Sequence, residues 1–395
     1  PDGEGHLLGA VGAWLKGAAH APAYHYDMMH DTARNEAYAA AIAEAVVGPD
    51  EFVLEIGTGS GLLALLSARC EGCQHVFTAE GEPGLAEAAR HVVEDNGYSD
   101  KITVLPALST ELQVGYACRA EDQRRSIPCR ADVLVAEIFD TGLVGEGVLP
   151  SFVDAHRRLL RPGARVVPHR GRVYAAGFRS EFLRSLDVLE SPSFDPIAGP
   201  HRQQVEAEAA ASPPAAATCP APVFQVQAAD LLRRGLAALV TEPAEVLCLE
   251  FGSPEKLVEE PAGDVRLRMT QDGLVDGVLM WWRLDMNPSG SIAISTSPLE
   301  ELALGEPVPR RSHWQQGACV FRAPPARRRF RGGEPVPLRV TVRGWDVHFA
   351  LQSEGEAERP RPPRQDPFAF PALQRHLLLR LADEPRLARL REEVR

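Results

Sequence analysis

The first half of the chain alternates between short apolar runs and longer stretches in which apolar residues recur at helical spacing. Apolar runs of about four to eight residues are typical of buried strands, and the longer periodic stretches predict helices. The expected strands are 52–56, 75–79, 102–105 and 133–136; the expected helices are 35–47, 62–68 and 85–96. Because strands and helices alternate at this rhythm, we expect an α/β domain built on a parallel sheet.

The pattern changes after about residue 168, where β-rich segments are separated by Gly and Pro. Such segments predict an antiparallel β domain, a sandwich or barrel. They are 172–176, 265–269, 277–284, 291–295, 319–322 and 338–342. We also expect a mobile Ala/Pro-rich loop at 207–222 and a helical tail at 371–395. The predicted division of the chain is 1–50, 51–168, 169–350 and 351–395.

The charge balance is acidic, with 42 Lys and Arg against 54 Asp and Glu, a net charge of −12. This argues against direct nucleic-acid binding, which needs a basic surface, and suits a cationic partner. No apolar run approaches the roughly 18 residues of a membrane span. The chain starts without Met, so a fragment is one interpretation. No secretory signal is visible, and we expect a cytoplasmic and nuclear location.

Seven cysteines are scattered along the chain, and Cys70 and Cys73 form a lone C-x-x-C pair. An odd number in a chain of this length favours reduced thiols over disulfides. The pair permits a redox or zinc-binding interpretation, but no second C-x-x-C or paired His follows at zinc spacing. Two ordinary thiols near a helix end are the simpler interpretation, and we expect no metal.

An acid and three glycines, Glu55, Gly57, Gly59 and Gly61, link the first expected strand to the next helix. Closely spaced glycines let a ligand approach the backbone because no Cβ intervenes. Glu55 would repel a pyrophosphate but can hold a cationic amino group, so S-adenosylmethionine fits better than a dinucleotide. Glu80 lies where an acid accepts hydrogen bonds from ribose hydroxyls. A tight turn without a ligand is the alternative.

Two glutamates, Glu137 and Glu146, lie nine residues apart in the loop after the expected strand 133–136. In such folds ligands bind at the carboxyl ends of the parallel strands. Two acids that converge there repel each other unless a cation lies between them. A guanidinium is planar and forked, so two carboxylates can grip it together. Alternatively, one or both glutamates face water, as most acids do.

Three segments together resemble the protein arginine methyltransferase family. The loop with Glu137 and Glu146 resembles that family's double-E loop, and the run Ser312, His313 and Trp314 resembles its Thr-His-Trp loop. Residues 27–35 resemble the segment that closes over the cofactor. The resemblance covers about residues 20–350. It implies a class I methyltransferase Rossmann-like domain followed by an antiparallel β-barrel domain, hence an α/β plus β fold.

The resemblance assigns contacts to a cofactor, S-adenosyl-L-methionine. Arg34 would pair with its carboxylate, Glu80 would hold its ribose, and Met28 would lie near its methyl group. The glycine loop would line the methionine part, and the turn at 109–111 would border the adenine. The full implied set is Met28, Arg34, Glu55, Gly57, Gly59, Gly61, Glu80, Ser109, Thr110 and Glu111.

The resemblance also assigns catalytic and acceptor-binding residues. Glu137 and Glu146 would clamp the substrate guanidinium, whose ordinary pKa of about 12.5–13.8 makes it a poor nucleophile. Trp314 would wall the arginine slot. His313 and Asp31 would carry the proton away, with a hydrogen-bonded structural histidine as an equal alternative.

The implied activity is methylation of arginine in proteins such as histones and RNA-binding proteins, with monomethylarginine as the product. The family works as a ring-shaped homodimer, or as a pseudo-dimer of two modules, and this chain would end as a second module begins. Two other functions stay open. One is a catalytically silent binding or scaffold protein, and the other is a small-molecule methyltransferase, which leaves the paired glutamates without a purpose.

Overall fold

The computed structural model describes residues 24–115, 125–186, 224–305, 313–321 and 329–352. The expected loop at 207–222 and the expected tail at 371–395 lie outside these ranges. The described elements of the first half are α2 (Tyr24–Met29), α3 (Thr32–Ala45), β1 (Glu51–Ile56), α4 (Leu62–Ala68), β2 (Cys73–Ala79), α5 (Pro83–Asp95), β3 (Ile102–Leu105), η1 (Ser109–Glu111), β4 (Gln113–Val114), β5 (Ser126–Ile127), β6 (Ala131–Ala136), α7 (Val148–Asp154), η2 (Ala155–Leu159) and β7 (Leu160–Val167).

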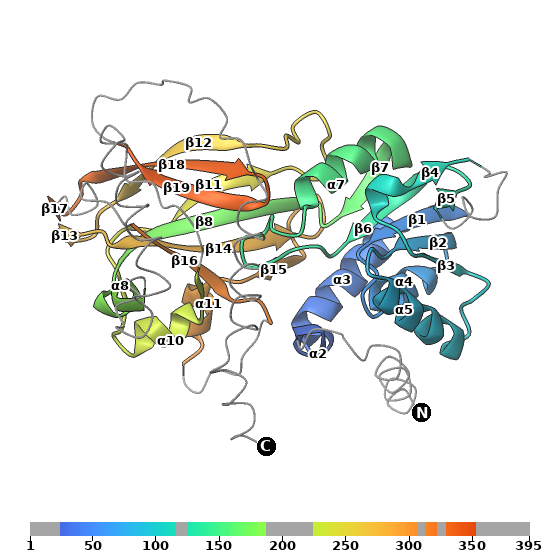
Figure 1. Cartoon of the computed structure of the whole chain (residues 1–395), viewed down its shortest axis with the longest axis horizontal. Coiled ribbons are helices and arrows are strands. Elements are labelled where there is room, and N and C mark those ends of the chain that lie inside the picture. The colour runs from blue at the N-terminus through green and yellow to red at the C-terminus, as the bar shows by residue number, and fades with distance from the viewer. Residues whose placement is uncertain (1–23, 116–124, 187–223, 306–312, 322–328, 353–395) are drawn as a thin grey trace, which may run out of the picture. The chain divides into compact units, whose positions relative to one another are not determined.

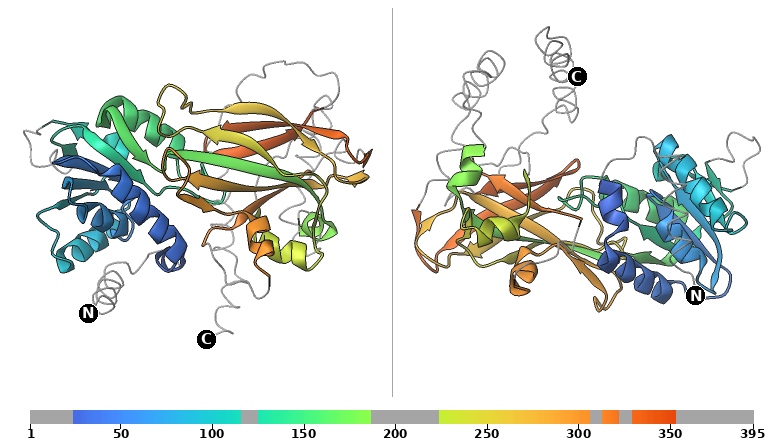
Figure 2. Two further views of the ribbon diagram at one scale, coloured as in Figure 1. Left: turned by 180° about the vertical axis from the view of Figure 1, so that it is seen from behind. Right: turned by 90° about the horizontal axis from the view of Figure 1, so that it is seen from below.

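The first half forms a parallel five-stranded sheet in the order β3-β2-β1-β6-β7. In Figures 1 and 2, α7 lies on the opposite side of this sheet from α4 and α5. The order places β1 between β2 and β6, so the loops after these three strands open at one edge. The predicted Rossmann-like α/β fold is therefore confirmed, and the glycine loop, Glu80 and the double-glutamate loop come from adjacent strands.

Helix α3 begins at Thr32, three residues before the predicted start at 35, because Asp31 caps it. The Oδ1 atom of Asp31 accepts the backbone N–H of Arg34 at 3.0 Å, which satisfies one of the helix's unpaired donors. This early start matters because it brings Arg34 into the helix, on its buried side.

The strand β7 was not predicted from the sequence. Its residues 160–167 include Pro162, Gly163 and two arginines, a composition typical of a loop. It lies at the edge of the parallel sheet. Proline is tolerated there because it has no N–H to donate, and one side of an edge strand has no neighbouring strand to accept a hydrogen bond. Tertiary position therefore overrides local propensity at this segment.

The second half is built from antiparallel strands. Its described elements are β8 (Arg170–Arg179), α8 (Glu181–Leu186), β9 (Phe224–Val226), α10 (Ala228–Arg233), β10 (Ala238–Leu239), β11 (Ala244–Leu249), β12 (Ala262–Arg268), β13 (Gly273–Leu274), β14 (Gly277–Asp285), β15 (Ala293–Ser295), α11 (Pro298–Ala303), β16 (Gln316–Val320), β17 (Arg329–Phe330), β18 (Pro335–Arg343) and β19 (Asp346–Leu351).

Strands β8 and β14 pair over almost their full lengths and anchor a sheet in the order β10-β8-β14-β16-β9, with β11 and β15 attached to it. A second sheet, β12-β18-β19, packs over it (Figure 1). Buried side chains between them, including Trp282, Leu338 and Phe349, belong to the same apolar core as the parallel sheet. The antiparallel, barrel-like half was predicted correctly, although the expected strand 319–322 is observed earlier, as β16.

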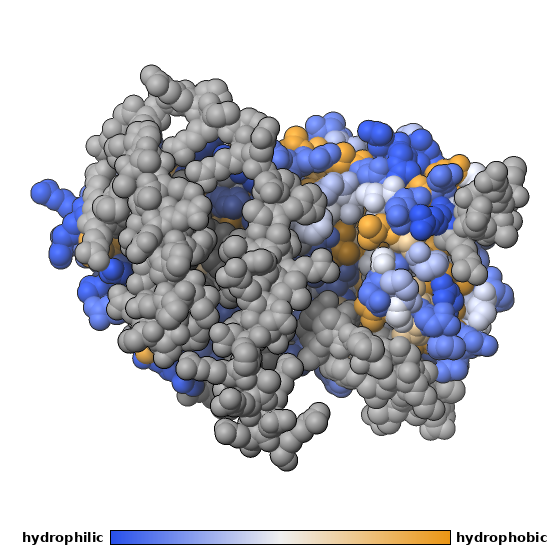
Figure 3. Space-filling view, in the orientation of Figure 1, coloured by the Kyte–Doolittle hydropathy of each residue, from blue (hydrophilic) through white to orange (hydrophobic). Residues whose placement is uncertain are grey.

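None of the helices that the structure describes is long and apolar enough to cross a bilayer. Figure 3 shows hydrophilic residues over much of the described surface of the parallel-sheet half, with smaller apolar areas between them.

Candidate active site

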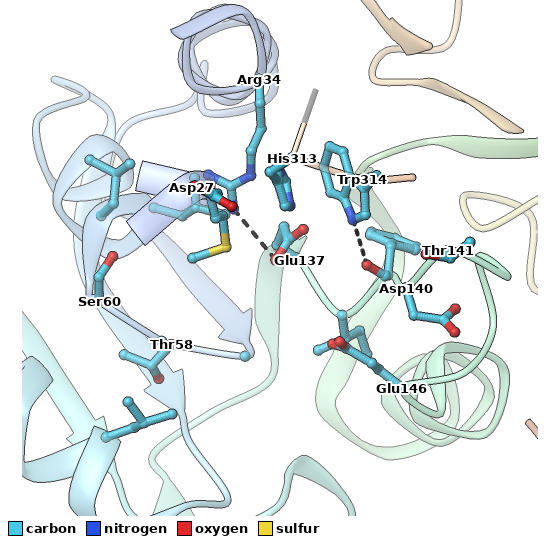
Figure 4. Close-up of a pocket in the computed structure, with 18 of the residues that line it drawn as sticks. Asp27, Arg34, Thr58, Ser60, Glu137, Asp140, Thr141, Glu146, His313 and Trp314 are labelled. Atoms are coloured by element: carbon cyan, nitrogen blue, oxygen red, sulfur yellow. Dashed lines mark hydrogen bonds and ion pairs between the residues drawn. The ribbon is translucent and has the colours of Figure 1, made fainter. Parts of the chain in front are cut away.

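A cavity of about 480 Å³ lies at the carboxyl edge of the parallel sheet, where the antiparallel half meets it. Its walls come from α2, α3, the glycine loop after β1, the end of β2, the loop between β6 and α7, and residues 313–315 before β16. In Figure 4, Glu137 lies between Arg34 and Trp314, while Thr58 and Ser60 line the opposite wall. Segments far apart in the sequence therefore meet at one site.

The glycine loop is closed by Glu80. One oxygen of this carboxylate accepts the N–H of Gly59 at 2.9 Å, and the other accepts the N–H of Glu82 at 2.9 Å. Gly57 adopts φ +86°, and a side chain there would clash with the loop after β6, because a Cβ would lie 2.8 Å from Ile138. These contacts hold Gly57, Gly59 and Glu80 on the cavity surface, and their expected contacts with a cofactor stay predictions.

Glu55 and Gly61 lie behind that surface. Glu55 is wholly buried, and Thr78 donates a 2.5 Å hydrogen bond to it while sharing a second with Thr58. Burial raises the pKa of Glu55 to about 8. Gly61 precedes α4 and faces α5, where a Cβ would lie 3.8 Å from the carbonyl oxygen of Ala89. A ligand in the cavity would therefore meet Thr58, which the sequence analysis did not single out, rather than Glu55 itself.

The turn at 109–111 is the short helix η1, and none of its three residues lines the cavity. Glu111 instead accepts the backbone N–H of Leu108 at 3.2 Å and pairs with Arg125 at 3.5 Å. The turn does border the site, because a Cβ on Gly81, next to Glu80, would lie 2.5 Å from Leu108. The expected role of this turn beside an adenine stays a prediction.

Arg34 and Glu137 meet inside the cavity with unused hydrogen-bonding atoms. Arg34 is 3% exposed, and its Nη2 lies 3.4 Å from Oε2 of Glu137. The Nε of Arg34 and the Oε1 of Glu137 are buried without a hydrogen-bond partner. Because a buried polar atom without a partner is costly, these two atoms mark where ligands of opposite charge fit: an anionic group at Arg34 and a cationic one at Glu137.

Glu146 lines the cavity and is also open to solvent, so it stands at the cavity mouth. Burial among protein atoms raises the pKa of Glu146 to about 7, helped by the negative charges of Glu137, Asp140 and Glu80. Asp140 secures the loop, because its Oδ1 accepts the N–H of Gly145 at 2.8 Å. The two predicted glutamates therefore share one cavity, and a cation between them would relieve their repulsion.

His313 and Asp31 form a pair across 282 residues of sequence. The Oδ2 of Asp31 accepts the backbone N–H of His313 at 3.2 Å and lies 3.2 Å from its Nδ1. Burial alone would raise the pKa of Asp31, but hydrogen bonds from His313 and the Arg34 backbone lower it below its ordinary value. His313 lines the cavity and Asp31 lies behind it, in contact with both His313 and α3.

Two indoles hold the double-glutamate loop. Trp314 Nε1 donates to the carbonyl of Phe139 at 2.7 Å, and Trp282 Nε1 donates to that of Asp140 at 3.0 Å. The two rings pack edge to face with centroids 4.8 Å apart. Trp314 thus lines the cavity, and its expected role as a wall of the arginine slot stays a prediction. Trp282 was missed as a support because nothing in its strand pattern distinguishes it from other core residues.

Met28 lines the cavity from α2 and is 7% exposed, and its expected place near the methyl group of the cofactor stays a prediction. Among the residues with described positions, no three His, Cys, Asp or Glu side chains are grouped as a metal ion requires. The expected absence of a metal stays a prediction. Cys70 and Cys73 are free thiols, and burial raises the pKa of Cys73 to about 11, which opposes a reactive thiolate.

The fold and the site define a Rossmann-like domain of the methyltransferase class joined to a β-barrel domain. A family model for the arginine methyltransferase oligomerization subdomain matches residues 226–344. Protein arginine N-methyltransferase 7 of Gallus gallus is 30% identical over 374 residues, covering 93% of this chain and 51% of the relative. That of Danio rerio is 31% identical over 336 residues, covering 82% and 45%. Over most of its own length the chain is therefore similar to protein arginine methyltransferases.

The chain spans about half the length of these relatives. Solved structures show the same fold at low sequence identity. The Trypanosoma brucei PRMT1 enzyme–prozyme heterotetrameric complex with AdoHcy has a TM-score of 0.59 at 18% identity, covering 85% of this chain and 95% of that chain. The crystal structure of PRMT6 has a TM-score of 0.54 at 20% identity, covering 82% and 97%.

Proposed function

We propose that this chain transfers a methyl group from S-adenosyl-L-methionine to a guanidino nitrogen of arginine in proteins. One observation supports this best: Glu137 and Glu146 line the same cavity as Arg34 and the glycine loop. A cationic acceptor and an anionic end of a donor would then lie side by side. The names of the similar proteins agree with this chemistry.

The residues present fit the cofactor. The buried Nε of Arg34 lacks a partner and suits a carboxylate, and Gly59 and Thr58 line the same cavity. Glu80 lies at the same wall, where it is positioned to exchange a backbone contact for ribose hydroxyls. When bound, S-adenosyl-L-methionine supplies an electrophilic methyl group on a sulfonium.

The two glutamates would bind and orient the arginine. Carboxylates hydrogen-bonded to some guanidinium nitrogens draw positive charge towards themselves, which leaves more electron density on the reacting nitrogen. The loop is rigid because Asp140, Trp282 and Trp314 all hold it. Holding reactants in a near-attack geometry is worth roughly 7–11 kcal/mol, so a loop held by these contacts would contribute to catalysis by positioning the arginine.

His313 would accept the proton that the acceptor nitrogen loses. With Nδ1 donating to Asp31, the Nε2 of His313 is the free acceptor, and the Asp31 carboxylate stabilises the resulting positive charge. This arrangement supports a proton-carrying role, which the sequence alone left equal to a structural one.

The finer features follow the same proposal. We infer arginine-rich substrates such as histones and RNA-binding proteins, monomethylarginine as product, and action in cytoplasm and nucleus. The net charge of −12 supports basic substrates. The match to an oligomerization subdomain supports assembly as a homodimer or with a second module. A catalytically silent scaffold is not favoured, because the charged groups that the chemistry needs converge in one cavity.

The test is incubation of the purified chain with labelled S-adenosyl-L-methionine and an arginine-rich histone-tail peptide, followed by mass spectrometry. The Glu146→Gln variant should abolish transfer, and Glu87→Gln, an exposed glutamate on α5, should not change it. Cofactor binding without transfer on a panel of basic peptides would overturn the enzymatic proposal.

A further inference from the structure

Trp345 is an exposed tryptophan whose position calls for an explanation. It lies in the turn between β18 and β19 and is 61% exposed, whereas Trp281, Trp282 and Trp314 are at most 5% exposed. A tryptophan ring offers a large apolar face together with an N–H donor, and such rings are enriched where proteins bind their partners. Tryptophan is also among the residues most enriched at the energetic centres of binding surfaces.

Trp345 lies beside the mouth of the cavity. Its indole faces Gly147, since a Cβ added to that glycine would lie 3.7 Å from Cε2 of the ring. Gly147 directly follows Glu146, which both lines the cavity and is open to solvent. Figure 1 shows the turn between β18 and β19 close to the start of α7. A peptide whose arginine enters the cavity therefore passes near this ring.

The surroundings of the ring are acidic. Asp346 is its neighbour in sequence, and Glu146 and Asp140 belong to the loop that it touches. Asp346 is close enough to Asp140 that, after burial, its charge contributes to the raised pKa of Asp140. A cation over an indole face is attracted by the ring, and nearby carboxylates add to that attraction.

From this arrangement we propose that Trp345 is a specificity-determining residue that stacks against a second basic side chain, Lys or Arg, near the target arginine in the same peptide. The inference rests on the proposed function, because it places the target arginine between Glu137 and Glu146. A purely structural role, in which the ring only supports Gly147, predicts a different outcome.

The experiment measures peptide binding by fluorescence anisotropy, with S-adenosylhomocysteine present so that no turnover occurs. One labelled peptide carries a single arginine flanked by lysines, and the other carries glutamines in their place. The full chain is compared with Trp345→Ala, Trp345→Phe and a control, Val47→Ala. Val47 is 68% exposed and precedes β1, at the edge of the sheet opposite the cavity.

Trp345→Ala should weaken binding of the lysine-flanked peptide about threefold to fivefold, the range of an exposed cation–π contact. Trp345→Phe should retain part of the affinity, and the glutamine-flanked peptide should bind all variants alike. Equal weakening of both peptides would assign Trp345 to support of the loop and overturn the proposal, as would no change in either.

Together with the transfer assay described above, which uses labelled S-adenosyl-L-methionine, the binding experiment separates this inference from the proposed function. Methyl transfer by the wild-type chain with no effect of Trp345→Ala refutes the Trp345 contact alone. Selective binding through Trp345 without any transfer refutes the enzymatic function and leaves the contact standing. Failure of the wild-type chain to bind either peptide refutes both.

Discussion

Under the proposed function, the charge state of Glu146 determines whether the site can hold a guanidinium. Its pKa is raised to about 7 by burial and by Glu137, Asp140 and Glu80, so near neutral pH the free protein holds it partly protonated. A protonated carboxyl group cannot balance a guanidinium, whereas the ionised form can. An arriving guanidinium favours ionisation and so lowers the pKa in the complex.

The first prediction concerns the pH dependence of methyl transfer. Because the proposed mechanism requires ionised Glu146, kcat/KM should rise with pH to a plateau above about pH 8. Below about pH 6 it should fall by up to about tenfold for each pH unit. The kcat profile should be displaced to lower pH, since substrate stabilises the ionised form. Initial rates with a basic peptide in a constant-ionic-strength buffer measure both. A profile flat from pH 5.5 to 8 would contradict this assignment.

The second prediction concerns stability. The folded-state pKa of Glu146 lies above its ordinary value of 4.5. Its contribution to the free energy of unfolding is therefore fully present below pH 4.5 and is lost as the pH rises through about 7. Glu146→Gln should therefore raise the melting temperature at pH 8 and leave it unchanged near pH 4.5. Because Glu146 is open to solvent, we expect the substitution to change the free energy of unfolding at pH 8 by less than about 1 kcal/mol. Thermal unfolding at both pH values tests this, and equal shifts at both would point to another cause.

At the scale of elements, α3 joins the two halves of the site. Its N-cap, Asp31, uses one oxygen for the helix and the other for His313 in the antiparallel half. Further along, Glu44 accepts a 2.7 Å hydrogen bond from Asn287 after β14. One helix therefore carries Arg34 to the cavity and is held at both ends.

The third prediction separates the two roles of Asp31. Asp31→Asn keeps an N-cap acceptor and should cost little stability, whereas Asp31→Ala should lose about 1 kcal/mol with the cap. Both should lower kcat, because neither stabilises a protonated His313. Chemical denaturation gives the stability and single-turnover rates give the chemistry. An Asp31→Asn variant with full activity would leave His313 as a structural residue.

At the scale of the whole molecule, the acidic net charge should direct substrate binding. Exposed charges are screened beyond about 8 Å at physiological ionic strength, so long-range attraction weakens with salt.

The fourth prediction is that KM for an arginine-rich peptide rises severalfold between 50 and 300 mM NaCl, with little change for a small neutral-backbone acceptor such as N-acetylarginine methylamide. The small acceptor is the matched control because it carries one charge. Equal salt dependence of both would show that local contacts, rather than the field of the chain, determine the attraction.

Residue patterns within each segment were sufficient to locate β1, β2, β3 and β6 of the parallel five-stranded sheet, because a buried strand needs a continuous apolar run. The strand β7 was not predictable in this way, since only its place at the sheet edge makes Pro162 acceptable. Glu55 was expected to hold a ligand, but the local sequence does not reveal that its side chain points behind the glycine loop towards Thr78.

The sequence by itself determined the α/β plus β architecture, the glycine loop and the candidate acids, because hydrophobic period and residue chemistry are local properties. Only the tertiary structure decided which groups meet: Asp31 with His313, Arg34 with Glu137, and the two indoles with the double-glutamate loop. It also set the pKa of Glu146, which depends on burial and on acids brought from other strands. These are long-range contacts, and their partners follow from the packing of the core rather than from spacing along the chain.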